Sequence, residues 1–142
     1  MSPHTPDYWQ KMNAGVIESF RSSGGRPRRR TLPLLLLTTV GARSGRSHTT
    51  PLNFSTDGGR LVVIASKGGS ATHPSWYHNL VANPQVKVEL GNETFRARAV
   101  PAMEPERTRL FAQQAAQMPF FDSYRKRVKA RQIPVVVLER IG

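Results

Sequence analysis

The sequence of 142 residues has no cysteine and no apolar run long enough to span a bilayer. The lack of cysteine excludes disulfide bonds and thiolate metal sites. The longest apolar runs, residues 34–37 and 135–138, have the length of buried strands, whereas a membrane helix needs about 20 apolar residues. Residues 1–12 include Asp7 and lack the apolar segment of a secretory signal. We therefore expect a soluble, cytoplasmic protein.

Acidic residues are scarce. Nine Asp and Glu stand against 21 Lys and Arg, which gives a formal net charge of +12. This excess predicts attraction to an anion, such as nucleic acid, an acidic membrane surface or an acidic small molecule. Much of it lies in three clusters, each of which could also be a solvated face that keeps the protein soluble. The clusters are Arg26 with Arg28, Arg29 and Arg30; Arg43 with Arg46; and Arg125, Lys126, Arg127, Lys129 and Arg131.

The usual catalytic motifs are also missing. The chain has no HExxH, GxSxG, GxGxxG or P-loop pattern, and its four histidines do not have the spacing of metal ligands, so we expect no metal. Glu89 and Glu93 flank a predicted hairpin, where surface ion pairs with arginines are the simplest interpretation. The scarcity of acidic residues and the excess of basic residues favour a site that holds an anionic cofactor over a site in which a general acid is paired with a general base.

The N-terminal part predicts a helix over residues 7–20. Trp9, Met12, Val16 and Phe20 recur at intervals of three and four, which is typical of an amphipathic helix. The apolar stripe could cover the mouth of a barrel, or it could attach the protein to a membrane surface. Residues 22–30 combine Gly, Ser, Pro and Arg and predict a flexible basic linker.

From Leu32 onward, short apolar runs separated by turn residues predict strands. The predicted strands are residues 32–40, 48–56, 60–66, 86–90, 94–100 and 133–141, with helices after residue 70, from Glu104-Pro105 and over 120–129. The first three strands form a β-meander, and the next two form a half-buried hairpin. Strands that close on themselves avoid exposed edges, so this order predicts a mainly β, α+β fold: an antiparallel barrel with helices.

The length fits one domain over residues 1–142, with an N-terminal helix and linker in 1–31 and the barrel core in 32–142. Two of its loops could cradle an anion. The loop of residues 41–46 (GARSGR) offers small residues with Arg43 and Arg46, and residues 65–69 (ASKGG) place Lys67 before two glycines. Both could equally be ordinary turns of a β protein. Trp76 and Tyr77 follow in the sequence, and their rings could either offer flat surfaces to a ligand or pack in the core.

Together these segments resemble a known family. The motifs TTxGxxSG, TxPL, ASKGG and HPxWYxNL, followed by IPVVVLE, are similar to the deazaflavin-dependent nitroreductase family, F420-dependent relatives of the flavin-binding split β-barrels. The similarity runs from about residue 34 to 90 and resumes at 133. It implies a split antiparallel β-barrel of the FMN-binding, pyridoxamine-phosphate-oxidase-like type. It also implies hydride transfer from reduced coenzyme F420 (F420H2) to a quinone, nitro compound or activated alkene.

The resemblance also implies site residues. For the cofactor these are Ala42, Arg43, Ser44, His48, Thr49, Thr50, Pro51, Leu52, Asn53, Ile64, Ala65, Ser66, Lys67, Ser75, Trp76, Tyr77, His78 and Asn79. Tyr124 matches a tyrosine that lines the substrate pocket in nitroimidazole-reducing members and is assigned as catalytic. Phe121 stands where another such tyrosine would be, which argues against nitroimidazole reduction. Phe120 and Phe121 are expected to line the substrate pocket, with core packing as their alternative.

Other functions stay open at this stage. The chain could be a non-catalytic carrier of F420 or FMN, an FMN enzyme, or a basic nucleic-acid-binding barrel. We expect no nucleic acid partner, because no stacking strand of the RNA-binding kind is evident. The expected partners are a small-molecule substrate and, only through diffusing cofactor, an F420-reducing dehydrogenase. A homodimer and peripheral contact of the N-terminal helix with the inner face of the membrane are further expectations.

Overall fold

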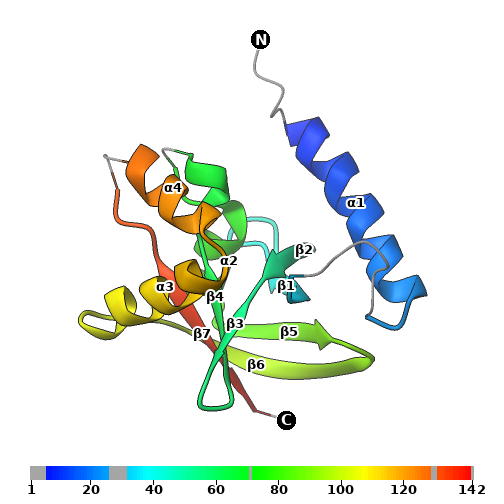
Figure 1. The fold of residues 1–142 in the computed structure, drawn as a ribbon. Helices are drawn as coiled ribbons and strands as arrows, with labels where there is room; N and C mark the ends of the chain where they lie inside the picture. Colours follow the sequence, from blue (N-terminus) through cyan, green and yellow to red (C-terminus); the bar gives the residue numbers. More distant parts are fainter. Residues whose placement is uncertain (1–5, 26–31, 71, 129–130, 142) are drawn as a thin grey trace.

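The computed structural model describes residues 6–25, 32–70, 72–128 and 131–141, with side chains of the first helix described from residue 11 on. Figure 1 shows the elements, coloured along the chain. In chain order they are α1 (Pro6–Ser22), β1 (Leu34–Val40), β2 (Ser47–Asn53), β3 (Ser55–Asp57), β4 (Arg60–Ile64), the 3-10 turn η1 (Lys67–Gly69), α2 (Ser75–Ala82), β5 (Gln85–Leu90), β6 (Glu93–Pro101), α3 (Glu106–Gln117), α4 (Phe120–Arg127) and β7 (Val135–Arg140).

The strands form one antiparallel sheet that curls back on itself. Its order is β2-β1-β5-β6-β7-β4-β3, and every neighbouring pair is antiparallel. The two edge strands, β2 and β3, are consecutive in the chain and separated only by Phe54. The sheet must therefore bend until its two edges meet at this residue, which gives the half-barrel in Figure 1. The predicted antiparallel barrel with helices is confirmed.

The prediction of one strand over residues 48–56 was wrong. The segment is two strands that turn at Phe54, because β2 pairs only with β1 and β3 pairs only with β4. At this corner the backbone N–H of Phe54 and the side-chain amide of Asn53 both donate to the carbonyl of Pro33. Instead of a meander, the segment forms two hairpins, β1 with β2 and β3 with β4, on either side of this corner. The strand predicted as the third of the meander is β4, which lies toward the opposite end of the sheet from β1 and β2.

Alternation along the strands separates two faces that are both buried. Leu35 and Leu37 of β1 point into the barrel with Leu61 and Val63 of β4. The intervening side chains point outward and are covered by helices. Leu34 and Leu36 pack under α1, and Val62, Ile64, Val135 and Val137 pack under α3 and α4. Burial on both faces explains why these strands read as continuous apolar runs.

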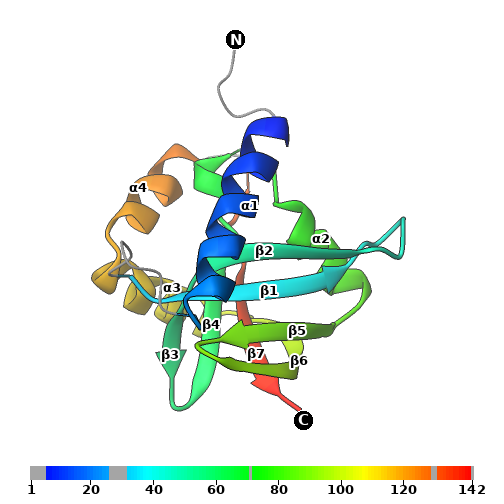
Figure 2. The ribbon, with the colours of Figure 1, turned by 90° about the vertical axis from the view of Figure 1, so that its right-hand side faces the viewer.

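Helix α1 lies across the outer face of β2 and β1, as Figure 2 shows. Val16, Ile17 and Phe20 pack against Leu34 and Leu36. Arg21 fixes the end of the helix by two hydrogen bonds to the carboxylate of Glu89, of 3.0 and 2.9 Å. Val16, Ile17 and Phe20 therefore face the barrel, whereas Met12 of the predicted stripe is exposed. The side chain of Trp9 and residues 26–31 of the predicted linker lie outside the described residues.

Helix α2 is joined to the end of β1 by the side chain of Asn79. This side chain is buried, and its oxygen accepts a hydrogen bond from the backbone N–H of Ala42 at 3.0 Å. Its amide nitrogen donates to the hydroxyl of Thr39 at 3.1 Å. Both ends of the amide are therefore used, and the 41–46 loop is tied to α2.

Helix α3 protects the short edge strand β3 through three successive residues. Ser55 donates to the buried amide oxygen of Gln114 at 2.9 Å, and the carbonyl of Thr56 accepts from Gln113 at 2.7 Å. Arg109 then donates two hydrogen bonds of 3.1 Å to Asp57. Hydrogen bonds from Arg109 and Arg60 lower the pKa of Asp57 to about 2. The edge is thus covered rather than exposed for pairing with another chain.

Replacing Asn79 tests the connection between α2 and the loop. Asn79→Ala leaves the buried hydroxyl of Thr39 and the N–H of Ala42 without this partner, so we expect the free energy of unfolding to fall by about 1–3 kcal/mol. Asn83→Ala is the matched control, because the exposed amide of Asn83 reaches only the carbonyl of Val40 at 3.5 Å. Urea unfolding of both variants makes the comparison. Equal losses would show that Asn79 is not the connection.

Acid unfolding tests the contact between β3 and α3. The pKa of folded Asp57, about 2, lies below its ordinary value of 3.8. Its ionised form therefore stabilises the fold fully above pH 3.8 and loses this effect as the pH falls toward 2. We expect Asp57→Asn to lower the urea midpoint at pH 7 and to have little effect near pH 2. Asp122→Asn, which removes a contact within α4, should have the smaller effect at pH 7. A pH-independent difference for Asp57→Asn would contradict this explanation.

Candidate functional site

One open pocket lies between α1, the 41–46 loop, the first half of β2 and α2. Its volume is about 820 Å³. No carboxylate lines it, while Arg43, His48 and His78 do, so its charge is positive. The pocket brings together these predicted site residues: Ala42, Arg43, Ser44, His48, Thr49, Thr50, Ser75, Trp76, His78 and Asn79. Helix α1 contributes Asn13, Ala14 and Ile17, which sequence reasoning did not assign to the site.

The 41–46 loop is a tight turn whose amides are largely used by the protein itself. The N–H of Gly41 donates to Arg46, and the N–H of Gly45 donates to Gly41. The hydroxyl of Ser44 accepts from the N–H of Arg46 at 3.2 Å. A β-carbon at position 41 would lie 2.5 Å from that hydroxyl oxygen, so a larger residue there would require the side chain of Ser44 to move. Arg43 and Arg46 are both exposed on this loop, and of the two only Arg43 lines the pocket.

The turn after β4 has a different character. We call residues 66–70 the Lys67 turn. Ser66 is in the right-handed helical region at φ −82° and ψ −32°, and Lys67 follows in the left-handed region at φ 49°, which is unusual for a residue with a side chain. A right-handed residue followed by a left-handed one directs successive N–H groups into a shared concavity that suits an anion.

The remaining predicted residues near this turn are mostly internal. Ile64, Ala65 and Ser66 are buried at the end of β4, whereas Lys67 is exposed and its ammonium lies 3.4 Å from the hydroxyl of Thr72. Sequence reasoning placed all four at the site, and the structure places them outside the lining of the pocket. Lys67 is thus the residue of this set whose side chain is open to a ligand.

A chain of rings runs from the pocket toward the Lys67 turn. His78 lines the pocket, and its ring centroid lies 5.7 Å from that of His73 and 6.1 Å from that of Tyr77. His73 and Tyr77 are 4.9 Å apart. Burial, together with the charges of Arg131 and His78, lowers the pKa of His73. Neutral His73 can therefore accept a hydrogen bond on Nδ1 from Arg131, at 2.9 Å.

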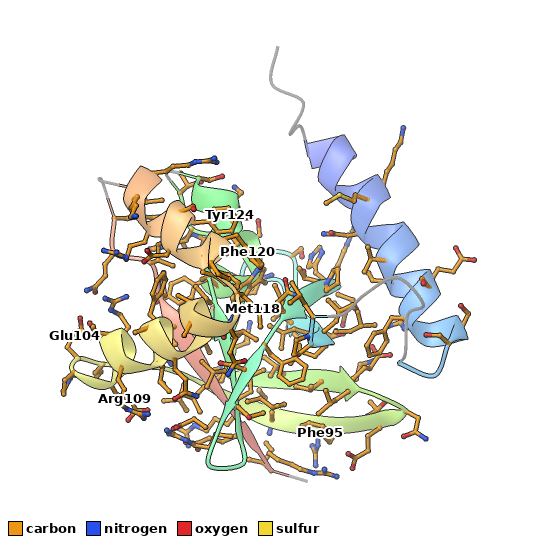
Figure 3. The ribbon with its side chains drawn as sticks, in the orientation of Figure 1. Phe95, Glu104, Arg109, Met118, Phe120 and Tyr124 are labelled. Atoms are coloured by element: carbon orange, nitrogen blue, oxygen red, sulfur yellow. The ribbon has the colours of Figure 1, made fainter. Side chains whose placement is uncertain are left out.

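The aromatic residues of α4 form a separate cluster. The ring of Phe120 lies 4.6 Å from that of Phe121 and 5.6 Å from that of Tyr124, between centroids. Phe121 is buried in the core beneath α3 and α4, while Phe120 and Tyr124 are half-buried. Figure 3 shows Tyr124, Phe120 and Met118 along the side of these helices that faces the middle of the molecule. Gly69 packs against Tyr124, which puts this cluster beside the Lys67 turn.

The last predicted residues, Pro51, Leu52 and Asn53, lie further along β2 and do not line the pocket. Leu52 packs on the barrel core, and Asn53 holds the corner at Pro33. Among the residues described here, no group of three or more His, Cys, Asp or Glu could hold a metal ion. The helices that the structure describes are all too short or too polar to cross a membrane.

Comparisons with known proteins place this architecture in a family. The family model of the F420H(2)-dependent quinone reductases matches residues 9–140. An F420H(2)-dependent quinone reductase of Mycobacterium tuberculosis is 40% identical over 111 residues, which cover 76% of this chain and 74% of the relative. A second, putative member from that species is 36% identical over 110 residues, covering 78% of this chain and 92% of the relative.

Solved structures agree. An F420H2-dependent reductase, FDR-A, superposes with a TM-score of 0.69 at 35% identity, over 75% of this chain and 94% of that one. A putative pyridoxamine 5'-phosphate oxidase from Listeria innocua, 12% identical over 92% of this chain and 94% of that one, shares the fold with a TM-score of 0.55. The match to the family model over nearly the whole described chain, together with the 40% identical relative, shows that this protein belongs to the F420H2-dependent quinone reductase family.

Proposed function

We propose that this protein uses F420H2 to reduce a quinone. Membership of the family makes it an F420-dependent oxidoreductase, and the relatives with 40% and 36% identity are both named quinone reductases. Nitro compounds and activated alkenes are the other acceptors that the sequence motifs suggest, and they rank below quinones because none of these relatives is named for them.

The observation that carries the proposal is the backbone of the Lys67 turn. F420 has an anionic phosphate and tail, and the paired conformations of Ser66 and Lys67 suit such a group. Holding a lysine at positive φ has a conformational cost, and such strain is often found at functional sites. The exposed ammonium of Lys67 adds a positive charge at the same turn. The residues present therefore fit the cofactor.

The pocket suits the ring of the cofactor and a planar acceptor. Trp76 and Ile17 give it apolar walls, Arg43 adds a charge for an anionic group, and no carboxylate lines it to repel the tail. When bound, F420H2 supplies a hydride, and the acceptor also takes up a proton as the quinone becomes a hydroquinone. The chain must hold the two rings together, exclude water between them and provide a path for that proton.

Tyr124 is our candidate for the proton path. Its ring packs on Phe120 and Phe121 and contacts Gly69, so its position is fixed beside the turn proposed to hold the anion. Phe120 is half-buried on the same helix and does not line the pocket, so it would meet the part of the acceptor that extends beyond the pocket. Phe121 is buried and supports these two side chains from behind.

The proposal also covers the setting of the enzyme. One similar structure, at 31% identity and a TM-score of 0.71, is described as a domain-swapped dimer, which supports a homodimer. We propose a cytoplasmic enzyme that receives reduced cofactor by diffusion from an F420-reducing dehydrogenase. Contact of α1 with the inner face of the membrane is a further proposal. It rests on Met12, which is 41% exposed while the rest of the described stripe packs on the barrel.

Cofactor binding is the first test. We expect purified protein to bind F420 and not FMN. Binding is measured by calorimetry and by the change in fluorescence of Trp76. Arg43→Ala and Lys67→Ala should each weaken F420 binding roughly tenfold, because each removes a charged partner of the anion. Arg46→Ala is the matched control for Arg43→Ala, since Arg46 belongs to the same loop but does not line the pocket. An equal loss in the control would mean that the overall charge matters and the pocket does not.

The outcome for the ligands separates the alternatives. Binding of FMN alone would indicate a flavin enzyme or carrier on the same fold. Binding of F420 without turnover of any quinone, nitroarene or activated alkene would indicate a carrier. Binding of neither, with affinity for nucleic acid that falls steeply with salt, would favour the basic nucleic-acid-binding barrel.

Replacing one hydroxyl tests Tyr124. Tyr124→Phe keeps the ring packing against Phe120 and Gly69 but removes the proton donor. We expect kcat/KM for a water-soluble quinone to fall about a hundredfold, the lower end for a lost general acid, with an unchanged Kd for F420. Steady-state kinetics and calorimetry on the same preparation give both values. Unchanged kcat/KM would remove Tyr124 from the proton path, and a raised Kd would assign it to cofactor binding.

A further inference from the structure

Arg131 makes an unusual set of contacts behind the Lys67 turn. It precedes β7, and its guanidinium donates to the backbone carbonyls of Ala65 at 3.1 Å, Ser66 at 2.7 Å and Ser70 at 3.1 Å. A fourth contact joins it to Nδ1 of His73 at 2.9 Å. The planar guanidinium thus forms hydrogen bonds at both ends of the turn, from a position more than 60 residues away in the sequence.

These contacts determine which way the amides of the turn point. In a trans peptide the C=O and N–H groups point in opposite directions. The carbonyl of Ala65 shares a peptide with the N–H of Ser66, and the carbonyl of Ser66 shares one with the N–H of Lys67. Drawing both carbonyls toward Arg131 therefore turns both N–H groups away from it, toward the outer side of the turn.

The charge of Arg131 is also not neutralised by a carboxylate. Within the described residues, no carboxylate lies within ion-pair distance of its guanidinium. Other arginines are paired, as Arg109 is with Asp57 and Arg107 is with Glu104. Burial lowers the pKa of Arg131, but a guanidinium stays protonated in proteins. Its positive charge therefore lies directly behind the outward-facing amides, where it adds to their attraction for an anion.

We propose that Arg131 is a positioning residue for cofactor binding, which holds the amides of Ser66 and Lys67 toward the anionic part of F420. This rests on the proposed function, and it adds to it a residue that does not line the pocket and that no sequence motif assigned. Arg131 acts through the backbone of the turn, and the charge of its guanidinium adds to the binding of the anion.

Two substitutions separate geometry from charge. Arg131→Lys keeps the charge but cannot reach three carbonyls and His73 at once, and Arg131→Gln loses both. Arg107→Lys is the matched control. Arg107 also donates to a backbone carbonyl on the segment before β7, that of Ile133 at 2.9 Å, but it contacts no residue of the Lys67 turn. Any general loosening of this segment should appear in both lysine variants as a similar fall in Tm.

The readout is the amide resonances of Ser66, Lys67 and Gly68 during titration with F420, and separately with inorganic phosphate, alongside the Kd for F420 from calorimetry. In the unsubstituted protein and in Arg107→Lys we expect these amides to shift with either probe. We expect the Kd to rise roughly tenfold in Arg131→Lys and a further tenfold in Arg131→Gln, with the shifts reduced in step.

Several results would overturn the role of Arg131. One is F420 binding to the unsubstituted protein without movement of these amides, which would leave the proposed function intact. Another is an Arg131→Lys protein that binds as tightly as the unsubstituted one, or an Arg107→Lys protein that loses as much. If F420 does not bind at all, the proposed function fails, and the phosphate titration alone then tests whether Arg131 positions these amides for an anion. Shifts that are present in the unsubstituted protein and lost in Arg131→Gln support the inference, and their absence overturns it.

Discussion

The structure depends on the closure of one sheet whose two edge strands are consecutive in the chain. Because β2 and β3 are separated only by Phe54, the seven strands must curl until these edges meet. After closure, side chains on the inner face of the sheet pack against one another, and apolar side chains on the outer face must be covered by helices. Helix α1 covers β1 and β2, while α3 and α4 cover β4 and β7. The pocket lies where α1 and α2 meet the strand ends.

The amide of Asn79 and the guanidinium of Arg131 each hold one loop near the site. Asn79 ties the 41–46 loop to α2 through both ends of its amide, and Arg131 ties the Lys67 turn to the segment before β7. In each case a buried or half-buried side chain adds hydrogen bonds to backbone groups of the loop, which restrict its conformation. The two loops thus owe their shape to contacts from distant parts of the chain.

The basic composition has more than one structural use. Several arginines pair with the scarce acids to join elements, as Arg21 joins α1 to β5 and Arg109 joins α3 to β3. Arg43 and Lys67 are exposed on the loops proposed to meet the cofactor, and Arg131 lies behind one of them. An anionic cofactor accounts for the positive charges at these two turns.

The sequence by itself determined the fold class, nearly all of the elements and the family, because strand alternation, turn residues and local motifs are encoded within a few neighbouring residues. It also indicated Arg43, Trp76 and Asn79, whose motifs are local. Only the tertiary structure decided that the segment at Phe54 is a corner, that Asn79 holds a loop, and that Arg131 lies behind Lys67. Each of these depends on contacts between residues far apart in the chain, which no local pattern specifies.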